Sequence, residues 1–136
     1  DKIHTLKPNL SEAEAISGIS INNKKNLQLA ADWFHRKGLK RIFISMGKKG
    51  IYFSNASGSG SVSLNKELEV KNVSGAGDAS MAALVNAFKK NYGIKKSAYQ
   101  ALIAASLAVE NKSTVNPLLT VKKITRIYNE FASKKK

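Results

Sequence analysis

The feature that most constrains the fold is a glycine-rich turn, Ser74–Asp78 (SGAGD), between a strand-like run and a long helical pattern. Residues 68–73 read as an extended strand, and apolar residues recur every three or four positions after Asp78. Two glycines let the backbone turn tightly, so several N–H groups can converge beside the start of the helix. A helix start favours anions. We therefore expect a strand–turn–helix unit that offers an anion site.

Strand-like and helical patterns alternate along the rest of the chain, which predicts a small α/β domain. Helices are expected over residues 11–17, 24–37 and 97–110, and from residue 120 onwards. Ser11 with Glu14 and Ser97 with Gln100 have the spacing of capping boxes, and Thr120 is the expected cap of the last helix. Strands are expected over residues 3–6, 41–45, 51–54 and 62–64, with 55–60 (NASGSG) as a flexible loop.

Composition excludes several classes of protein. With 136 residues, 43% of them hydrophobic, the chain can fill one core. The absence of cysteine rules out disulfides and thiolate metal sites and fits a reducing cytoplasm. No apolar run is long enough to span a membrane, so we expect no membrane partner. No secretory signal is visible, and the first residue is Asp1 instead of Met, so we expect a fragment.

The formal net charge of +14 raises the question of nucleic-acid binding. The basic residues are mostly lysines scattered in pairs, and the only arginines are Arg36, Arg41 and Arg126. Base recognition depends on arginine forks, and basic charge alone gives only unspecific attraction. We therefore expect no specific nucleic-acid partner, although lysines can help to collect anionic nucleotides.

Three segments carry candidate chemistry. In the first, Asp78 would place a carboxylate beside the anion site, an arrangement suited to transferring a phosphoryl group to a hydroxyl. The alternative is a plain helix start with an acidic residue.

In the second segment, Asn9 and Glu12 lie three residues apart at a strand-to-helix turn. They could serve phosphate and the water shell of Mg²⁺, or only cap the helix. In the third, Ser45–Gly50 could wrap a nucleotide or form an ordinary β-hairpin.

These segments, in this order, resemble the ribokinase-like (phosphofructokinase B) family of sugar kinases. The residues that carry the resemblance are KPNLSEAEAISG (7–18), ISMGKKGIYF (44–53) and VSGAGDASMAAL (73–84), and it covers essentially the whole chain. HTLKPN (4–9), Asn72 and STVNPLLT (113–120) are most similar to pseudouridine kinases. The implied fold is α/β and ribokinase-like, with a partial sheet flanked by helices.

The resemblance implies a role for each matching position. Asp78 would be the base that takes the proton from the substrate hydroxyl, and the N–H groups of Gly75, Ala76 and Gly77 would form the anion hole. Asn9 and Glu12 would bind nucleotide phosphate and order Mg²⁺ through water. The implied cofactors are ATP and Mg²⁺, and the implied substrate is a small sugar or nucleoside.

The resemblance also implies nucleotide-contacting residues and a cation site elsewhere in the chain. Ser45, Gly47 and Gly50 would contact the nucleotide, and adenine would pack near Leu102, Ile103 and Ser106, for which core packing is the alternative. Relatives often bind a monovalent cation near Asn72, Ser74 and residues 108–113. Many have Asp where Asn72 stands, which puts that cation in doubt here.

Family members are roughly twice as long as this chain, so it corresponds to their C-terminal, ATP-binding part, without the lid and substrate half. We expect it to be inactive alone and to associate, as a homodimer or through the missing half, because an open sheet edge invites pairing. Three functions stay open: an ATP-dependent kinase of a ribosyl compound, with pseudouridine preferred; a non-catalytic nucleotide-binding or regulatory module; and a basic nucleic-acid-binding domain.

Overall fold

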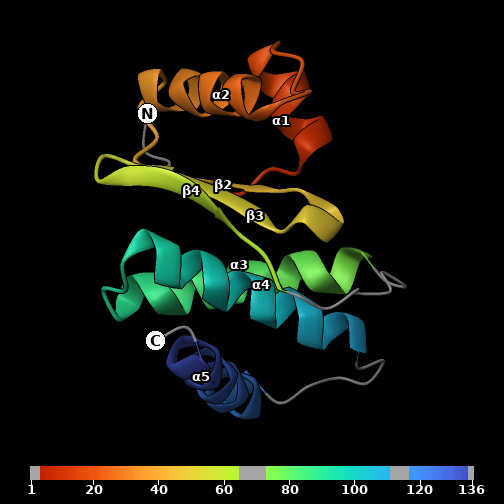
Figure 1. Cartoon of the computed structure of the whole chain (residues 1–136), viewed down its shortest axis with the longest axis vertical. Helices are drawn as coiled ribbons and strands as arrows, with labels where there is room; N and C mark the ends of the chain where they lie inside the picture. Colours follow the sequence, from red (N-terminus) through yellow and green to blue (C-terminus); the bar gives the residue numbers. More distant parts are fainter. Residues whose placement is uncertain (1–3, 65–72, 111–116, 135–136) are drawn as a thin grey trace. The chain divides into compact units, whose positions relative to one another are not determined.

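The computed structural model describes residues 4–64, 73–110 and 117–134, and the chain divides into two compact units. The first comprises Asp1–Val62 and the second Ser63–Lys136. Figure 1 shows the elements of both units.

The first unit is a sheet with helices on one face. The strands that the structure describes run in the order β1 (Thr5–Leu6), β2 (Arg41–Ser45), β3 (Ile51–Asn55) and β4 (Gly58–Val62). Only β1 and β2 are parallel; the other neighbours are antiparallel. Helices α1 (Leu10–Ser17) and α2 (Lys24–Arg36) lie over one face of this sheet (Figure 1).

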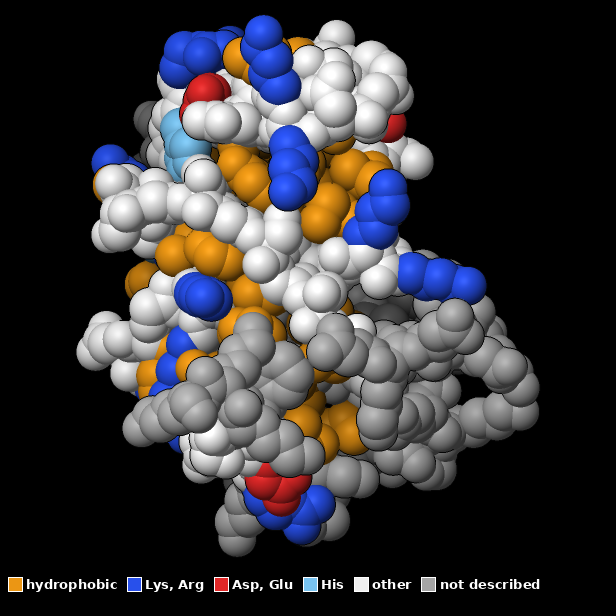
Figure 2. Space-filling model, viewed as in Figure 1, with side chains coloured by type: hydrophobic (Ala, Val, Ile, Leu, Met, Phe, Trp, Pro, Cys, Tyr) orange, Lys and Arg blue, Asp and Glu red, His pale blue; other side chains and the backbone are white. Residues whose placement is uncertain are grey.

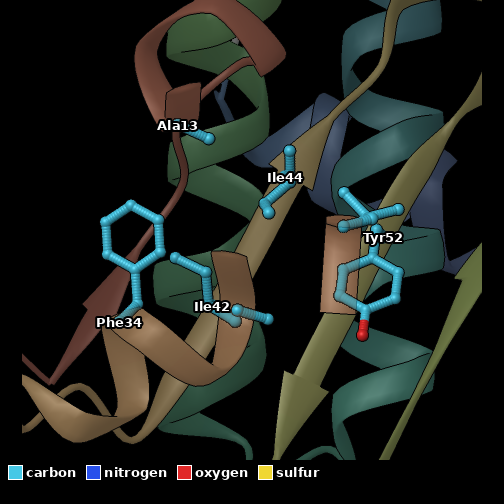
Figure 3. Close-up of a cluster of buried hydrophobic side chains, with 7 residues drawn as sticks. Ala13, Phe34, Ile42, Ile44 and Tyr52 are labelled. Carbon is cyan, nitrogen blue, oxygen red and sulfur yellow. The ribbon is translucent and has the colours of Figure 1, made fainter. Parts of the chain in front are cut away.

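The core of the first unit explains why this sheet and these helices form. Side chains from α1, α2, β2 and β3 meet in one cluster, where Phe34, Ile42 and Ile44 are at most 1% exposed (Figure 3). The helix side of the cluster comes from α2, whose apolar residues recur at helical spacing; the buried ones are Leu27, Ala30, Ala31 and Phe34. Removing a side chain such as that of Phe34 is expected to cost about 3–5 kcal/mol of stability.

The second unit consists of helices among the described residues: α3 (Val73–Lys89), α4 (Ile94–Glu110) and α5 (Pro117–Lys134). Helix α3 packs along α4 through small side chains, and the Ser80 hydroxyl donates to the carbonyl of Ala101 at 3.0 Å. Ile124 of α5 joins a cluster with Ala83, Ile103 and Ala104. The Lys96 ammonium lies 3.9 Å from the ring centre of Tyr92 and 5.1 Å from that of Tyr128. These contacts join α5 to α4.

The predicted α/β class is confirmed, but the predicted extent of the hairpin loop was wrong. Residues 55–60 were expected to be a flexible loop, whereas β3 runs to Asn55 and β4 begins at Gly58. The Asn55 side chain accepts hydrogen bonds from the N–H groups of Ser57 and Gly58, which closes a turn of two residues. Gly58, Ser59 and Gly60, which read as part of a loop, therefore lie in a strand paired with β3.

The three expected helix caps were also wrong. Helix α1 is capped by Asn9 and not by Ser11, with Glu12 and not Glu14 as the reciprocal partner. Helix α4 begins at Ile94, and the Ser97 hydroxyl donates back to the carbonyl of Gly93 at 2.9 Å. Helix α5 begins at Pro117, before Thr120, and proline suits a first helical position because its missing N–H has no partner there. The expected strand over 68–73 lies almost wholly outside the described residues.

Candidate functional site

The ends of two parallel strands bring the first group of candidate residues together. Thr5 pairs with Arg41 and Leu6 with Ile42, and the same register reaches an isolated bridge between Asn9 and Ser45. The N–H of Ser45 donates to the carbonyl of Pro8 at 2.9 Å. The carboxyl ends of β1 and β2 therefore lie at one edge, the place where open α/β sheets bind ligands.

Asn9 and Glu12 are joined by a reciprocal capping box at this edge. The N–H of Glu12 donates to Asn9 Oδ1 at 2.8 Å, and the N–H of Asn9 donates to Glu12 Oε1 at 3.0 Å. Both side chains are exposed. The structural interpretation of this pair is thus confirmed, and the cap fixes both polar groups at a helix start, where anions are favoured.

The loop that follows β2 requires glycine at two of the predicted positions. Residues 47–49 form a single 3₁₀ turn, with Gly47 at φ 59° and Gly50 at φ 94°. The N–H of Met46 donates to the carbonyl of Gly50 at 2.8 Å and closes the loop. Positive φ favours glycine, so both glycines have a conformational role whatever the loop binds. The hairpin interpretation is confirmed, since β2 pairs with β3 across this loop.

Lys7 is a residue that the sequence analysis did not single out. Its side chain is half-buried at the end of β1, and burial lowers its pKa, an effect that the nearby Glu12 carboxylate opposes. Side chains alternate along an extended segment. Leu6 packs on the core and Pro8 is buried, so Lys7 and Asn9 share the opposite side. Alternation within KPN was the signal that could have identified it.

The second group of candidate residues lies on α3. The helix already begins at Val73, so the expected turn over Ser74–Asp78 is wrong: these residues form the first turns of the helix. The backbone of Gly75 and Ala76 lies in this helix, and Gly77 shows no positive φ. Asp78 lies in the second turn and its side chain is exposed. The first unit holds Asn9, Glu12 and the loop; the second holds Asp78.

The predicted adenine-packing residues are buried in the second unit. Ile103 is 1% exposed and belongs to the cluster with Ala83, Ala104 and Ile124. Leu102 and Ser106 are also buried. For Ile103 this is the core packing that the sequence left open as the alternative. The cation site suggested for Asn72 and residues 111–113 lies outside the described residues, and nothing is described of the Ser74 side chain or of those of residues 108–110.

The single carboxylate near Asn9, that of Glu12, suits a hard metal ion that takes most of its ligands from water and substrate phosphates. Among the described residues, no three His, Cys, Asp or Glu side chains gather into a metal-binding group. Mg²⁺ keeps several waters and takes one or two carboxylates together with substrate phosphates, so a single exposed Glu12 fits it.

Two surface observations concern the membrane and nucleic-acid partners considered from the sequence. Within the described ranges, no helix combines the length and apolar character needed to cross a bilayer. On the face drawn in Figure 2, lysine and arginine side chains are spread over the coloured surface without forming one continuous patch.

Comparison with known proteins identifies the class that this fold and these motifs define. The family model for pfkB family carbohydrate kinases matches residues 1–121. The chain belongs to this family. It is 40% identical over 121 residues to the pseudouridine kinase of Escherichia coli strain K12, a match that covers 89% of this chain and 39% of that protein.

Solved structures agree on the fold. A Clostridium perfringens protein classed as a sugar kinase is 28% identical with a TM-score of 0.85, over 93% of this chain and 40% of that one. Arabidopsis thaliana ribokinase complexed with ribose and ATP is 24% identical with a TM-score of 0.77, over 91% of this chain and 41% of that one, and supports the fold alone. The chain thus spans about two fifths of the length of these relatives.

Proposed function

We propose that this chain is the nucleotide-binding and base-bearing part of a kinase that transfers the γ-phosphoryl group of ATP to a hydroxyl of a sugar or nucleoside. The observation that carries the proposal is the shared edge of β1 and β2, where Asn9, Glu12 and the loop after Ser45 meet. Membership of the pfkB family supplies the class of reaction.

The residues of the first unit have the chemistry to hold a nucleotide. The exposed Asn9 amide and the N–H groups of Gly47 and Lys48 can donate to phosphate oxygens, and Glu12 can hold Mg²⁺ through water. The N–H groups of Met46, Lys49 and Gly50 already donate to carbonyls within the loop. When bound, Mg²⁺ offsets the negative charge of the phosphates. Phosphoryl transfer needs mostly positioning and electrostatic stabilisation, which fixed backbone groups provide.

Asp78 supplies the base that accepts the proton of the acceptor hydroxyl. In the proposed step the acceptor hydroxyl oxygen bonds to the γ-phosphorus, the bond from that phosphorus to the β–γ bridging oxygen breaks, and ADP leaves. The proton of the hydroxyl passes to the Asp78 carboxylate. Gly75, Ala76 and Gly77 precede Asp78 in the first turns of α3, where helical N–H groups have no intrahelical acceptor or have just gained one.

Pseudouridine is the acceptor we favour. The 40% identity to a pseudouridine kinase extends over most of this chain and supports that choice. The phosphorylated group would be the 5′-hydroxyl. The residues that select the acceptor are expected in the part of the relatives that this chain does not span.

The protein expressed from its complete reading frame, with Asp78→Asn, provides the test. We expect phosphoryl transfer to pseudouridine to fall by at least about a hundredfold, since a positioned base contributes roughly 10²–10⁴-fold. Nucleotide affinity should stay within about threefold, because the carboxylate acts on the acceptor and not on ATP. The measurements are coupled ADP release and calorimetric titration with ATP and Mg²⁺.

Two controls make the result interpretable. Asp32→Asn removes a carboxylate from α2 in the other unit and should leave both quantities unchanged. Ribose and adenosine in place of pseudouridine test the acceptor class. Unchanged turnover in the Asp78 variant would remove this residue from the mechanism. Nucleotide binding without transfer by the unsubstituted protein would favour the non-catalytic module instead.

A further inference from the structure

We propose that Lys96 is an acetylation-sensitive latch of helix α5, which lies beside α4 (Figure 1). Its ammonium group lies 3.9 Å from the ring centre of Tyr92 and 5.1 Å from that of Tyr128, and we call these three side chains the latch. While the charge is present the latch holds α5 on α4, and neutralising the charge frees α5. The latch lies wholly in the second unit and uses none of the residues of the proposed function.

Tyr128 is the side chain that α5 contributes to the latch. It lies one turn after Ile124, which is 4% exposed in a cluster with Ile103 of α4, and its half-buried ring packs against the same cluster. The ring of Tyr128 also lies 6.0 Å from that of Tyr99, at an angle of 60°. Lys96 and Tyr99 are three residues apart, so they lie on one face of α4. Tyr128 therefore meets α4 through a charge and through a second ring.

The place of Lys96 in α4 shows what its charge gains from the rings. Lys96 stands in the first turn of the helix, which begins at Ile94. A helix start disfavours cations, because its N–H groups carry partial positive charge. Tyrosine rings attract an ammonium group within about 6 Å of their centres, and more strongly where water is partly excluded. Because Tyr92 and Tyr128 are half-buried, their attraction offsets the unfavourable position for as long as Lys96 is charged.

Acetylation removes the property on which the latch depends. The neutral amine of Lys96 attacks the acyl carbon of an acyl phosphate, an N–C bond forms, and the C–O bond to phosphate breaks. Of the two protons that the ammonium group loses, one passes to the phosphate and one to solvent. The resulting amide has no charge and makes no cation–π contact, whereas methylation would keep the charge.

Lys37 shows why the same modification would have no such effect elsewhere. Its ammonium group lies 5.3 Å from the ring centre of Trp33, which is only four residues earlier in the chain. This contact is local to the end of α2 and joins no second helix to it. Neutralising Lys37 would therefore free no helix.

Hydrogen exchange measured by mass spectrometry tests the latch in the protein from its complete reading frame. The samples are Lys96→Gln, Lys96→Arg, Lys95→Gln and the protein acetylated at Lys96 alone. We expect the amides of α5 to exchange about two- to fivefold faster in the Lys96→Gln and acetylated proteins, the factor that one cation–π contact supplies. Lys96→Arg should stay close to the unsubstituted protein, because a guanidinium group keeps the charge and stacks on aromatic rings.

Lys95 is the matched control, because it is exposed and lies in the same first turn of α4. Lys95→Gln removes a cation from the helix start, so exchange in α5 should stay unchanged or slow down. The amides of α2, in the other unit, report global unfolding. Equal exchange of α5 in Lys96→Gln and Lys95→Gln would overturn the proposal, and so would equal acceleration in α2 and α5.

A double-mutant cycle assigns the effect to the pair of Lys96 and Tyr128. In a Tyr128→Leu protein, Lys96→Gln should have little further effect on α5, since the ring is already gone. In a Tyr128→Phe protein, Lys96→Gln should keep its effect, because the ring face remains. Additive effects of Lys96→Gln and Tyr128→Leu would show that the lysine acts through another contact, and the latch would be ruled out.

Discussion

Asn9 shows how one side chain can begin a helix and still face solvent. Its Oδ1 accepts the N–H of Glu12, which leaves the amide NH₂ as the group that could donate to a ligand. The functional and structural interpretations of Asn9 and Glu12 are therefore compatible, because they use different atoms. The same reasoning applies to Glu12, whose Oε1 accepts the N–H of Asn9 while Oε2 remains as a second acceptor.

Substitution at Asn9 should separate the two uses. Asn9→Ser keeps an oxygen that can cap α1 but removes the amide, so we expect stability within about 0.5 kcal/mol and weaker nucleotide binding. Asn9→Ala removes the cap as well and should cost about 1 kcal/mol. Urea denaturation and ATP titration measure the two effects. If Asn9→Ser bound ATP as tightly as the unsubstituted protein, the amide would have no role in the site.

At the scale of elements, the N-terminal part of α3 is the clearest departure from expectation. The glycines of SGAGD suggested a tight turn, yet they lie in regular helix, and a Cβ built at Gly77 meets nothing within 4 Å. Folding of α3 therefore does not require glycine at this position. A ligand that approaches the backbone closely would require it, since a Cβ would then fill the space.

This contrast gives a prediction for Gly77→Ala. We expect the variant to be more stable by roughly 0.5–1 kcal/mol, because alanine is the better helix former, and to transfer phosphate more slowly. Gly18→Ala is the matched control: Gly18 has φ 73° at the end of α1, so the same change there should destabilise by about 1 kcal/mol. Thermal unfolding and ADP release are the measurements. A Gly77→Ala protein with full activity would argue against an anion hole at this residue.

For the whole molecule, net charge is the property that acts on both units. The formal charge of +14 on 136 residues makes self-repulsion part of the folding free energy. The same charge attracts any polyanion, so contact with DNA or RNA at low salt would not by itself indicate a specific site.

Salt should therefore have two opposite effects. Raising NaCl from about 0.02 to 0.5 M is expected to increase the melting temperature, because screening reduces repulsion between like charges. The same change should abolish retention on DNA, with little difference between sequences. Thermal scans and filter binding at several salt concentrations test this. Tight, sequence-selective DNA binding at about 0.15 M salt would instead support the third function considered from the sequence.

The sequence by itself determined the α/β class and most strands and helices, because apolar periodicity is a local property of the chain. The family followed from the resemblance of three motifs, which the family model bears out. The patterns over 24–37 and 41–45 identified α2 and β2 almost to the residue. The tertiary structure decided which of several polar residues caps α1 and that residues 58–62 pair as a strand, because both depend on hydrogen-bond partners that local pattern does not specify. It also brought Asn9 beside Ser45, since the parallel register of β1 with β2 joins segments more than thirty residues apart.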